Sequence, residues 1–329
     1  MTRPPRVAIV GAGLMGRWHA TACRRAGGQV VGIVDVDIHA AHRLARRLGH
    51  PAVAVSLETL PSGAELDLVH ICTPPETHAE QIRSALARRC SVIAEKPLAP
   101  TAAETEALLA EAGRAGCWVL PVHQAAFQHG IRQAVRWVSG GGLRAFDYRV
   151  CSAGASADPQ GADAVAADIL PHPLALLDLI VPQALEAAWQ VYRPCAGEIA
   201  VSGVAGLTAV SVLISMHARP PRHDLTLMTD TCTVRADLFH GFAWRESGAT
   251  SRFAKMARPV RAGAAASSSA AVNLVRRALS REAAYPGLMP LVRQAYDSLR
   301  DGTPRPLDDR HTLAVARARD GILQRLAHA

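Results

Sequence analysis

The chain has 329 residues, of which 49% are hydrophobic and 19% charged, and its formal net charge is +8. This length exceeds what one ordinary hydrophobic core accommodates and predicts two domains. The sequence contains no run of about eighteen uncharged apolar residues and no secretory cleavage signal, so we expect a cytoplasmic protein that has no membrane partner. Its arginines occur in short groups at helical spacing without interleaved aromatic residues, which argues against nucleic acid as a partner.

The cysteines and lysines of the chain indicate which kinds of functional site it contains. The seven cysteines are spread along the chain without a C-x-x-C pair, so we predict reduced thiols and no metal site. Of the 36 basic residues, only Lys96 and Lys255 are lysines. A lysine that persists in such an arginine-rich chain is a candidate for a role that requires a compact ammonium group or a tunable pKa.

Short apolar runs alternate with helical stretches in the first 122 residues. We predict strands at 7–10, 30–34, 68–72, 92–94 and 118–122, and helices at 14–25, 38–48, 76–88 and 102–115. Strands that are apolar on both faces and alternate with helices are typical of a doubly wound parallel sheet. The fold class is therefore α/β, with residues 1–122 as its first domain.

The pattern changes after residue 122. We predict helices at 131–138, 164–181, 262–280, 288–300 and 312–327, strands at 144–151, 187–192, 208–216, 224–228, 233–238 and 242–245, and a small-residue loop through Gly161. Consecutive strands joined by short turns favour a mostly antiparallel sheet, so residues 123–329 are predicted to form an α+β domain. The alanine-rich segment 255–285, which contains Pro259, is a candidate for a flexible flap or for the wall of a pocket that accepts a bulky substrate.

A glycine-rich turn follows the first predicted strand. Residues 11–16 read G-x-G-x-x-G, with Gly11, Gly13 and Gly16 as the glycines and Leu14 and Met15 between the last two. In this context the three glycines permit a tight turn, approach of a pyrophosphate to the backbone, and close packing of helix on strand. The N–H groups of the following helix then receive the phosphates, which predicts a dinucleotide site.

Asp35 stands nineteen residues beyond Gly16, at the end of the second predicted strand. A carboxylate at this place accepts hydrogen bonds from the ribose hydroxyls of adenosine and repels a 2′-phosphate, which favours NAD over NADP. Asp37 and the arginines of the following helix could soften that preference, so NADP stays possible.

Glu95, Lys96 and Pro97 follow the strand at 92–94. The carboxyl edge of a parallel sheet is where ligands bind in such folds, and a lysine there can donate to a substrate oxygen or to the nicotinamide ribose. The alternative is an ordinary surface pair of Glu95 and Lys96 at a strand end.

Three motifs give the chain a resemblance to the glucose–fructose oxidoreductase, inositol dehydrogenase and MocA (Gfo/Idh/MocA) family. They are the glycine turn near the N-terminus, the T-P-x-x-x-H pattern from Thr73 to His78, and the E-K-P pattern from Glu95 to Pro97. The resemblance covers the first domain well. It implies that Thr73, His78 and Glu95 border the nicotinamide.

A fourth motif lies in the second domain, where Asp168 and His172 match the D-x-x-x-H pattern of the family. Residues four apart share one face of a helix, so the carboxylate and the imidazole would project together. Histidine titrates near neutrality and transfers protons, and a neighbouring carboxylate orients the ring. The alternative is a buried histidine flanked by prolines.

The resemblance also implies roles for these residues. Lys96 would polarise a substrate carbonyl, and His172, supported by Asp168, would be the general acid or base while hydride moves between nicotinamide C4 and the carbon that bears the hydroxyl. Further candidates are Gln124 for the carboxamide of the cofactor and His123 and Phe127 for the substrate.

Ala175 departs from the family pattern, since many sugar-acting members carry a second acid there. Four functions stay open: a dehydrogenase for a sugar, cyclitol or sugar-derived metabolite, a reductase of imines or conjugated C=C bonds, an NAD-dependent glycosidase, and a non-catalytic NAD-sensing regulator. The resemblance implies homodimers or homotetramers that form through the open face of the second sheet, and a small molecule as substrate.

Overall fold

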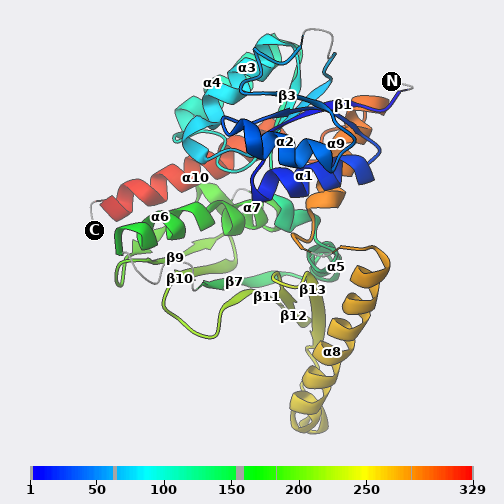
Figure 1. The fold of residues 1–329 in the computed structure, drawn as a ribbon. Helices are drawn as coiled ribbons and strands as arrows, with labels where there is room; N and C mark the ends of the chain where they lie inside the picture. The colour runs from blue at the N-terminus through cyan, green and yellow to red at the C-terminus, as the bar shows by residue number, and fades with distance from the viewer. Residues whose placement is uncertain (1–2, 62–64, 153–158, 183, 283, 328–329) are drawn as a thin grey trace. The chain divides into compact units, whose positions relative to one another are not determined.

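The computed structural model describes residues 3–61, 65–152, 159–182, 184–282 and 284–327, and these form two compact units (Figure 1). The first unit comprises residues up to Val122 together with Leu288–Arg317, and the second comprises His123–Gly287 and the chain from Ala318 onward. One boundary between the two units thus falls after residue 122. Residues 123–329, however, are not one continuous domain, because Leu288–Arg317 packs with the first unit.

The first unit contains a six-stranded parallel sheet in the order β3-β2-β1-β4-β5-β6. Its strands are β1 (Arg6–Val10), β2 (Gln29–Val34), β3 (Ala52–Ala54), β4 (Leu68–Ile71), β5 (Ser91–Ala94) and β6 (Val119–Pro121). The sequence did not predict β3, which is only three residues long. The chain switches from one side of β1 to the other between β3 and β4, and the carboxyl ends of β1 and β4 flank the crevice where ligands bind in such sheets.

Helices α1 (Leu14–Arg25), α2 (Ile38–Arg46), α3 (His78–Ala87) and α4 (Ala102–Arg114) connect these strands, as predicted, and a short 3₁₀ turn at Pro75–Thr77 precedes α3. Two C-terminal elements complete the unit: α9 (Leu288–Asp301), which packs on α1, and the first half of α10 (Asp309–Ala327). Tyr296 of α9 is fully buried, and a Cβ atom on Gly28 would lie only 2.5 Å from its ring. This long-range packing is why α9 belongs to the first unit.

The second unit contains a seven-stranded sheet in the order β13-β12-β11-β7-β10-β9-β8. Its strands are β7 (Leu143–Cys151), β8 (Gln190–Tyr192), β9 (Glu198–Ala205), β10 (Thr208–Ser215), β11 (Arg222–Thr229), β12 (Cys232–Asp237) and β13 (Phe242–Ser247). All neighbours are antiparallel except β7 and β10, which confirms the predicted mostly antiparallel sheet. The sequence missed β9, in which Ser202 and Gly203 interrupt the apolar alternation that signals a strand.

The helices of the second unit correct two predictions. They are α5 (His129–Val138), α6 (Pro159–Ile169), α7 (Pro171–Ile180) and α8 (Arg252–Leu279), with 3₁₀ turns at Gln124–Phe127 and Ala184–Glu186. The predicted helix 164–181 is two helices, because Pro171 and Pro173 have no N–H groups to continue the hydrogen-bond ladder. The predicted small-residue loop ends earlier, since α6 begins at Pro159, and positions 153–158 lie outside the described residues.

The second correction concerns the segment 255–285. The prediction of a flexible flap is wrong, whereas the predicted helix at 262–280 is confirmed and begins earlier than expected. It is α8, one helix of 28 residues that begins where the Ser251 side chain accepts a hydrogen bond of 3.2 Å from the Ala254 N–H. Pro259 lies inside this helix. Alanine, the best helix former, is frequent enough here to outweigh one lost backbone hydrogen bond.

Candidate functional site

The glycine turn between β1 and α1 has the geometry that a dinucleotide requires. Gly11 has a φ of +95°, and a Cβ atom there would lie 2.6 Å from the Cys72 carbonyl oxygen after β4. A Cβ atom on Gly16 would lie 1.8 Å from the Gly11 carbonyl oxygen, so only glycine allows this contact of helix and strand. Around Gly13, by contrast, a Cβ atom would meet no described atom within 4 Å.

Gly13 also caps α1, and no side chain makes a capping hydrogen bond to the first turn within the described part of the chain. Backbone N–H groups at a helix N-terminus attract anions, both as donors and through the helix dipole. Open space at Gly13 beside this helix end fits a pyrophosphate. The residues present therefore fit the cofactor that the motif implies.

Asp35 follows β2 and lies directly beside the glycine turn. One of its carboxylate oxygens accepts a hydrogen bond of 2.6 Å from the Ala12 N–H, and the other accepts one of 2.8 Å from the Asp37 N–H. Each oxygen keeps a second lone pair, so the carboxylate can still accept from ribose hydroxyls.

A pocket of about 250 Å³ lies next to Asp35. Its lining residues are Ala12, Gly13, Arg17, Ala40, Arg43, Leu44 and Arg47. Asp37 caps α2 beside it, and hydrogen bonds from the backbone, foremost from Ala40, hold the pKa of its carboxyl below the usual value. Three of the lining residues are arginines, whose positive charge would attract the 2′-phosphate of NADP.

His78 ties together the two loops that carry the next candidate residues. Its ring is fully buried, with Nδ1 2.7 Å from the Pro97 carbonyl oxygen and Nε2 2.8 Å from the Thr73 carbonyl oxygen. It therefore joins the loop after β4 to the Glu95–Pro97 loop after β5. The Lys96–Pro97 peptide bond is cis. The buried His78 side chain thus connects the two loops through its ring nitrogens.

Glu95 is the end of a buried hydrogen-bond chain that sequence reasoning missed. Its Oε1 lies 3.2 Å from His19 Nε2, His19 Nδ1 lies 2.8 Å from His70 Nδ1, and His70 Nε2 lies 2.9 Å from the Tyr296 hydroxyl (all in the first unit). His19, His70 and Tyr296 are fully buried. They come from α1, β4 and α9, so no local pattern in the sequence relates them.

The donors and acceptors of this chain have one consistent direction. For an ionised Glu95, which only accepts, and a His19 ring with a single N–H, His19 Nε2 donates to Glu95 and His19 Nδ1 accepts from His70 Nδ1. His70 Nε2 is then an acceptor for the Tyr296 hydroxyl. Burial lowers the pKa of His70 well below its usual value and raises that of Tyr296, so the ring is neutral and the phenol keeps its proton. The network thus fixes the orientation of the Glu95 carboxylate, and Glu95 directly precedes Lys96 in the sequence.

His172, the candidate acid or base of the second unit, lies beside a second histidine. His172 lies in the first turn of α7, partly buried, with its ring centroid 6.2 Å from that of His223 in β11. His223 Nε2 makes a short hydrogen bond with the Tyr148 hydroxyl of β7. Burial lowers the pKa of His223 to about 4, so this ring is neutral near pH 7. Neither His223 nor Tyr148 was predicted from the sequence as a site residue.

The remaining candidates of the second unit have distinct environments. Asp168 is exposed on the last turn of α6, whereas His172 lies on α7, so the prediction that the two share one face of a single helix is wrong. Arg319 of α10 is within electrostatic range of Asp168. The Gln124 side-chain oxygen is buried and accepts no hydrogen bond from the described residues, which fits an amide ligand. His123 and Phe127 are 4% and 7% exposed, so Phe127 serves mainly as packing.

The described ranges lack two features that would point to other functions. No helix in them is both long and apolar enough to cross a bilayer. They also hold no group of three or more His, Cys, Asp or Glu side chains arranged to bind a metal ion.

Known proteins resemble the chain in two ways. An inositol 2-dehydrogenase of Saccharopolyspora erythraea is 36% identical over 100 residues, which is 30% of either chain. A dTDP-3,4-didehydro-2,6-dideoxy-alpha-D-glucose 3-reductase of Saccharopolyspora spinosa is 32% identical over 138 residues, or 41% of either chain. The chain thus matches less than half the length of these curated relatives.

A solved structure matches nearly the whole fold. Levoglucosan dehydrogenase in complex with NADH and levoglucosan superposes with a TM-score of 0.78 over 99% of this chain and 98% of that one, at 14% identity. The model of an oxidoreductase family with an NAD-binding Rossmann fold, Gfo/Idh/MocA, matches residues 5–123. Together with the glycine turn and the Glu95–Pro97 loop, this match identifies residues 5–123 as the NAD-binding Rossmann domain of the Gfo/Idh/MocA oxidoreductase family.

Proposed function

We propose that the protein is an NAD-dependent dehydrogenase that interconverts a secondary alcohol and a ketone on a sugar, a cyclitol or a sugar-derived metabolite. Relatives of the first unit are named for inositol and for a deoxysugar nucleotide, and a structure with the same fold holds levoglucosan. These ligands share secondary hydroxyl groups on a ring.

The observation that carries this proposal is the setting of Lys96. It follows β5 at the carboxyl edge of the sheet, in a loop fastened by His78 to the loop after β4, whose Cys72 carbonyl contacts the glycine turn. An ammonium group there can donate to a developing alkoxide and stabilise its charge. Lys96 would thereby favour removal of the hydroxyl proton.

The proton itself requires a second group, and His172 is our candidate. An imidazole titrates near neutral pH and can accept the hydroxyl proton or return it in the reverse direction. His223, neutral and hydrogen-bonded to Tyr148, would limit positive charge beside His172. Asp168 would orient or stabilise the charged ring from α6. When bound, NAD supplies the hydride acceptor at nicotinamide C4.

We further propose that NAD is preferred over NADP. The Asp35 carboxylate is anchored by two backbone N–H groups and would repel a 2′-phosphate. Arg17, Arg43 and Arg47 would reduce the penalty for NADP.

A spectrophotometric screen for NADH formation with cyclitols, aldoses and anhydrosugars tests the activity. The diagnostic variant is Lys96→Arg, which keeps the charge but replaces the compact ammonium with a planar fork, and we expect a loss of kcat of at least about a hundredfold. The matched control is Lys255→Arg, at the other lysine of the chain, which lies exposed on α8 and should keep full activity. Equal activity of both variants would refute the proposed role of Lys96.

Turnover of imines that survives in His172→Ala but not in Lys96→Arg would favour a reductase of C=N bonds. Substrate cleavage without net formation of NADH would favour a glycosidase.

A further inference from the structure

Helix α8 has a large apolar surface that its own chain leaves uncovered. The unit packs β13 against one side of α8, while the opposite side is open to solvent (Figure 1). The exposed fractions of its large apolar residues are 79% for Phe253, 81% for Met256, 76% for Val260, 69% for Val272, 71% for Leu274, 60% for Val275 and 82% for Leu279. Contiguous apolar patches of this kind mark interaction sites on folded proteins.

The apolar residues recur with the spacing of a coiled-coil seam. Phe253, Val260, Ser267 and Leu274 are each seven residues apart, and alanines stand four residues after each of them, at positions 257, 264, 271 and 278. Alternating steps of four and three residues place all eight on one stripe of a helix. The members are Phe253, Ala257, Val260, Ala264, Ser267, Ala271, Leu274 and Ala278, which we call the α8 stripe. None of them is charged.

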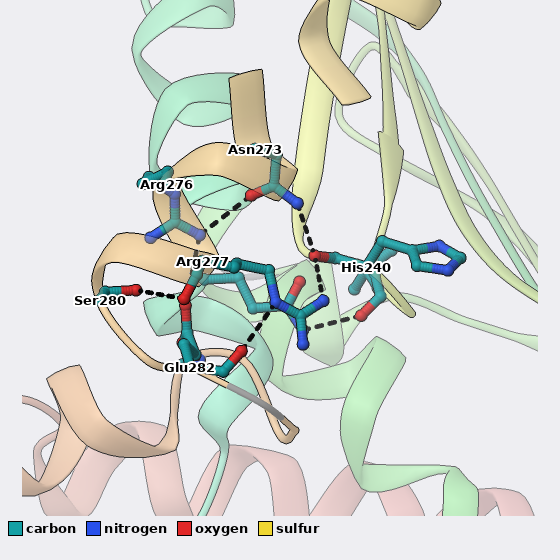
Figure 2. Close-up of polar contacts among 9 residues, drawn as sticks. His240, Asn273, Arg276, Arg277, Ser280 and Glu282 are labelled. Carbon is teal, nitrogen blue, oxygen red and sulfur yellow. Dashed lines mark hydrogen bonds and ion pairs between the residues drawn. The ribbon is translucent and has the colours of Figure 1, made fainter. Parts of the chain in front are cut away.

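One asparagine and three arginines of α8 are instead held by hydrogen bonds and ion pairs within their own unit. At the C-terminal end, Asn273 donates to the His240 carbonyl oxygen at 2.9 Å, and Arg277 donates to the same oxygen at 3.1 Å (Figure 2). Arg276 pairs with Glu282 at 3.3 Å. Nearer the N-terminal end, Arg258 pairs with Glu246 of β13 at 3.1 Å. These contacts fix the rotation of α8, so the stripe faces away from the sheet.

We propose that the α8 stripe pairs with the α8 stripe of a second copy of this chain, antiparallel, about a two-fold axis between Ala265 and Ala266. In that register Phe253 lies opposite the partner's Ala278, Val260 opposite the partner's Ala271, and Leu274 opposite the partner's Ala257. Every large side chain thus meets an alanine, which lets the two helices approach closely and interlock. In a parallel pair, Phe253 would instead face the partner's Phe253, and each alanine would face the same alanine of the partner. The large side chains would then hold the helices apart and leave gaps between the alanines.

The available surface suits a dimer contact. An apolar side chain of this class offers roughly 60–120 Å² when fully exposed. Five of the exposed side chains lie on the stripe or three to four residues from its members: Phe253, Met256, Val260, Leu274 and Val275. At 60–81% exposure they offer roughly 200–500 Å² per copy. A pair could bury roughly 400–1,000 Å² through these side chains, and the exposed alanines and Ser267 of the stripe add to it, which approaches the size of about 1,000 Å² expected of a specific interface. The antiparallel arrangement also sets the two helix dipoles in opposition, which is favourable.

A membrane surface suits the stripe less well. Between Val260 and Leu274 the stripe contains only Ala264, Ser267 and Ala271, and these side chains are too small to insert deeply among lipid chains. The same small residues favour close contact between two helices.

Cysteine cross-linking tests the register directly. In a Cys195→Ser background, which removes the exposed native cysteine, a double variant Phe253→Cys and Ala278→Cys is oxidised with diamide and examined by non-reducing electrophoresis. We expect covalent dimers, because the two positions face each other across the pair within disulfide range. Each single variant should stay monomeric in the gel, since identical positions lie 25 residues, about 38 Å, apart along the axis. Efficient cross-linking of either single variant, or none of the double variant, would overturn the proposal.

Light scattering of the full chain tests the contact without cysteines. Leu274→Glu places a charge in the stripe and should halve the particle mass, whatever other contacts persist. The matched control, Val272→Glu, changes an equally exposed residue away from the stripe and should leave the mass unchanged. NAD-binding heats confirm that both variants are folded. An unchanged particle mass in Leu274→Glu would refute self-pairing. Self-pairing would also be refuted if the wild type bound phosphatidylglycerol vesicles and Leu274→Glu lost that binding without a change in mass.

Discussion

Removal of the Tyr296 hydroxyl tests the buried chain that ends at Glu95. In Tyr296→Phe the ring remains, so no cavity forms beside Gly28, but His70 Nε2 loses its donor at a site with no solvent access. Leaving one buried acceptor unsatisfied costs about 1–3 kcal/mol. For a protein of this size each kcal/mol lowers the melting temperature by roughly 2–4 °C.

The assay is thermal unfolding followed by circular dichroism, with Tyr192→Phe as the matched control. The Tyr192 hydroxyl donates to Gln190 at 2.8 Å, but its residue is 52% exposed, so water can replace the lost contact. We expect a change within about 0.5 kcal/mol for the control. Equal melting temperatures for the two variants would show that the Tyr296 hydroxyl does not complete the chain, and the assigned donor direction would be wrong.

Three other predictions concern the cofactor, pH and the long helix. Asp35→Asn removes the charge that repels a 2′-phosphate, so the ratio of kcat/KM for NAD over NADP should fall roughly tenfold, or ~1.4 kcal/mol; an unchanged ratio in parallel assays would count against Asp35. The pKa of His223 is about 4 in the fold and 6.5 ordinarily, so between these values the unfolded chain binds a proton that the native chain does not. Stability from the neutral ring is thus present above pH 6.5 and lost as pH falls towards 4, by up to about 3 kcal/mol, and urea titrations at both ends should show this loss in the wild type but not in His223→Gln. Pro259→Ala restores a backbone N–H inside α8 and should raise the free energy of unfolding by up to about 3 kcal/mol, whereas a lower melting temperature would contradict the helix.

Local sequence patterns predicted much of the fold. Apolar runs and their turns predicted five of the six strands of the first sheet within two residues at either end, and the glycine turn needed only its flanking strand and helix to be recognised. The missed β3 is too short to show a pattern. The break between α6 and α7 was visible in Pro171 and Pro173, but residues on both sides are helical and apolar enough to suggest one helix.

Contacts between residues that lie far apart in the sequence could not be predicted from local patterns. His19 and His70 are 51 residues apart and Tyr296 another 226 residues beyond, so only the pairing of β1 with β4 and the packing of α9 on α1 bring the three together. The same holds for His223, which the predicted strand 224–228 excluded by one residue and which meets Tyr148 only through the pairing of β11 with β7. A buried histidine in a single sequence gives no sign of its partner.

Calorimetric titration of NAD into the wild type and into Gly13→Ala is the most direct test that the glycine turn holds the cofactor. A Cβ atom at Gly13 meets no described atom within 4 Å, so the fold should tolerate it and the melting temperature without NAD should stay unchanged. The added methyl would instead occupy the space left for the pyrophosphate, and we expect NAD affinity to fall by at least about tenfold, ~1.4 kcal/mol. Failure of the wild type to bind NAD, or equal affinity in the two proteins, would contradict this account.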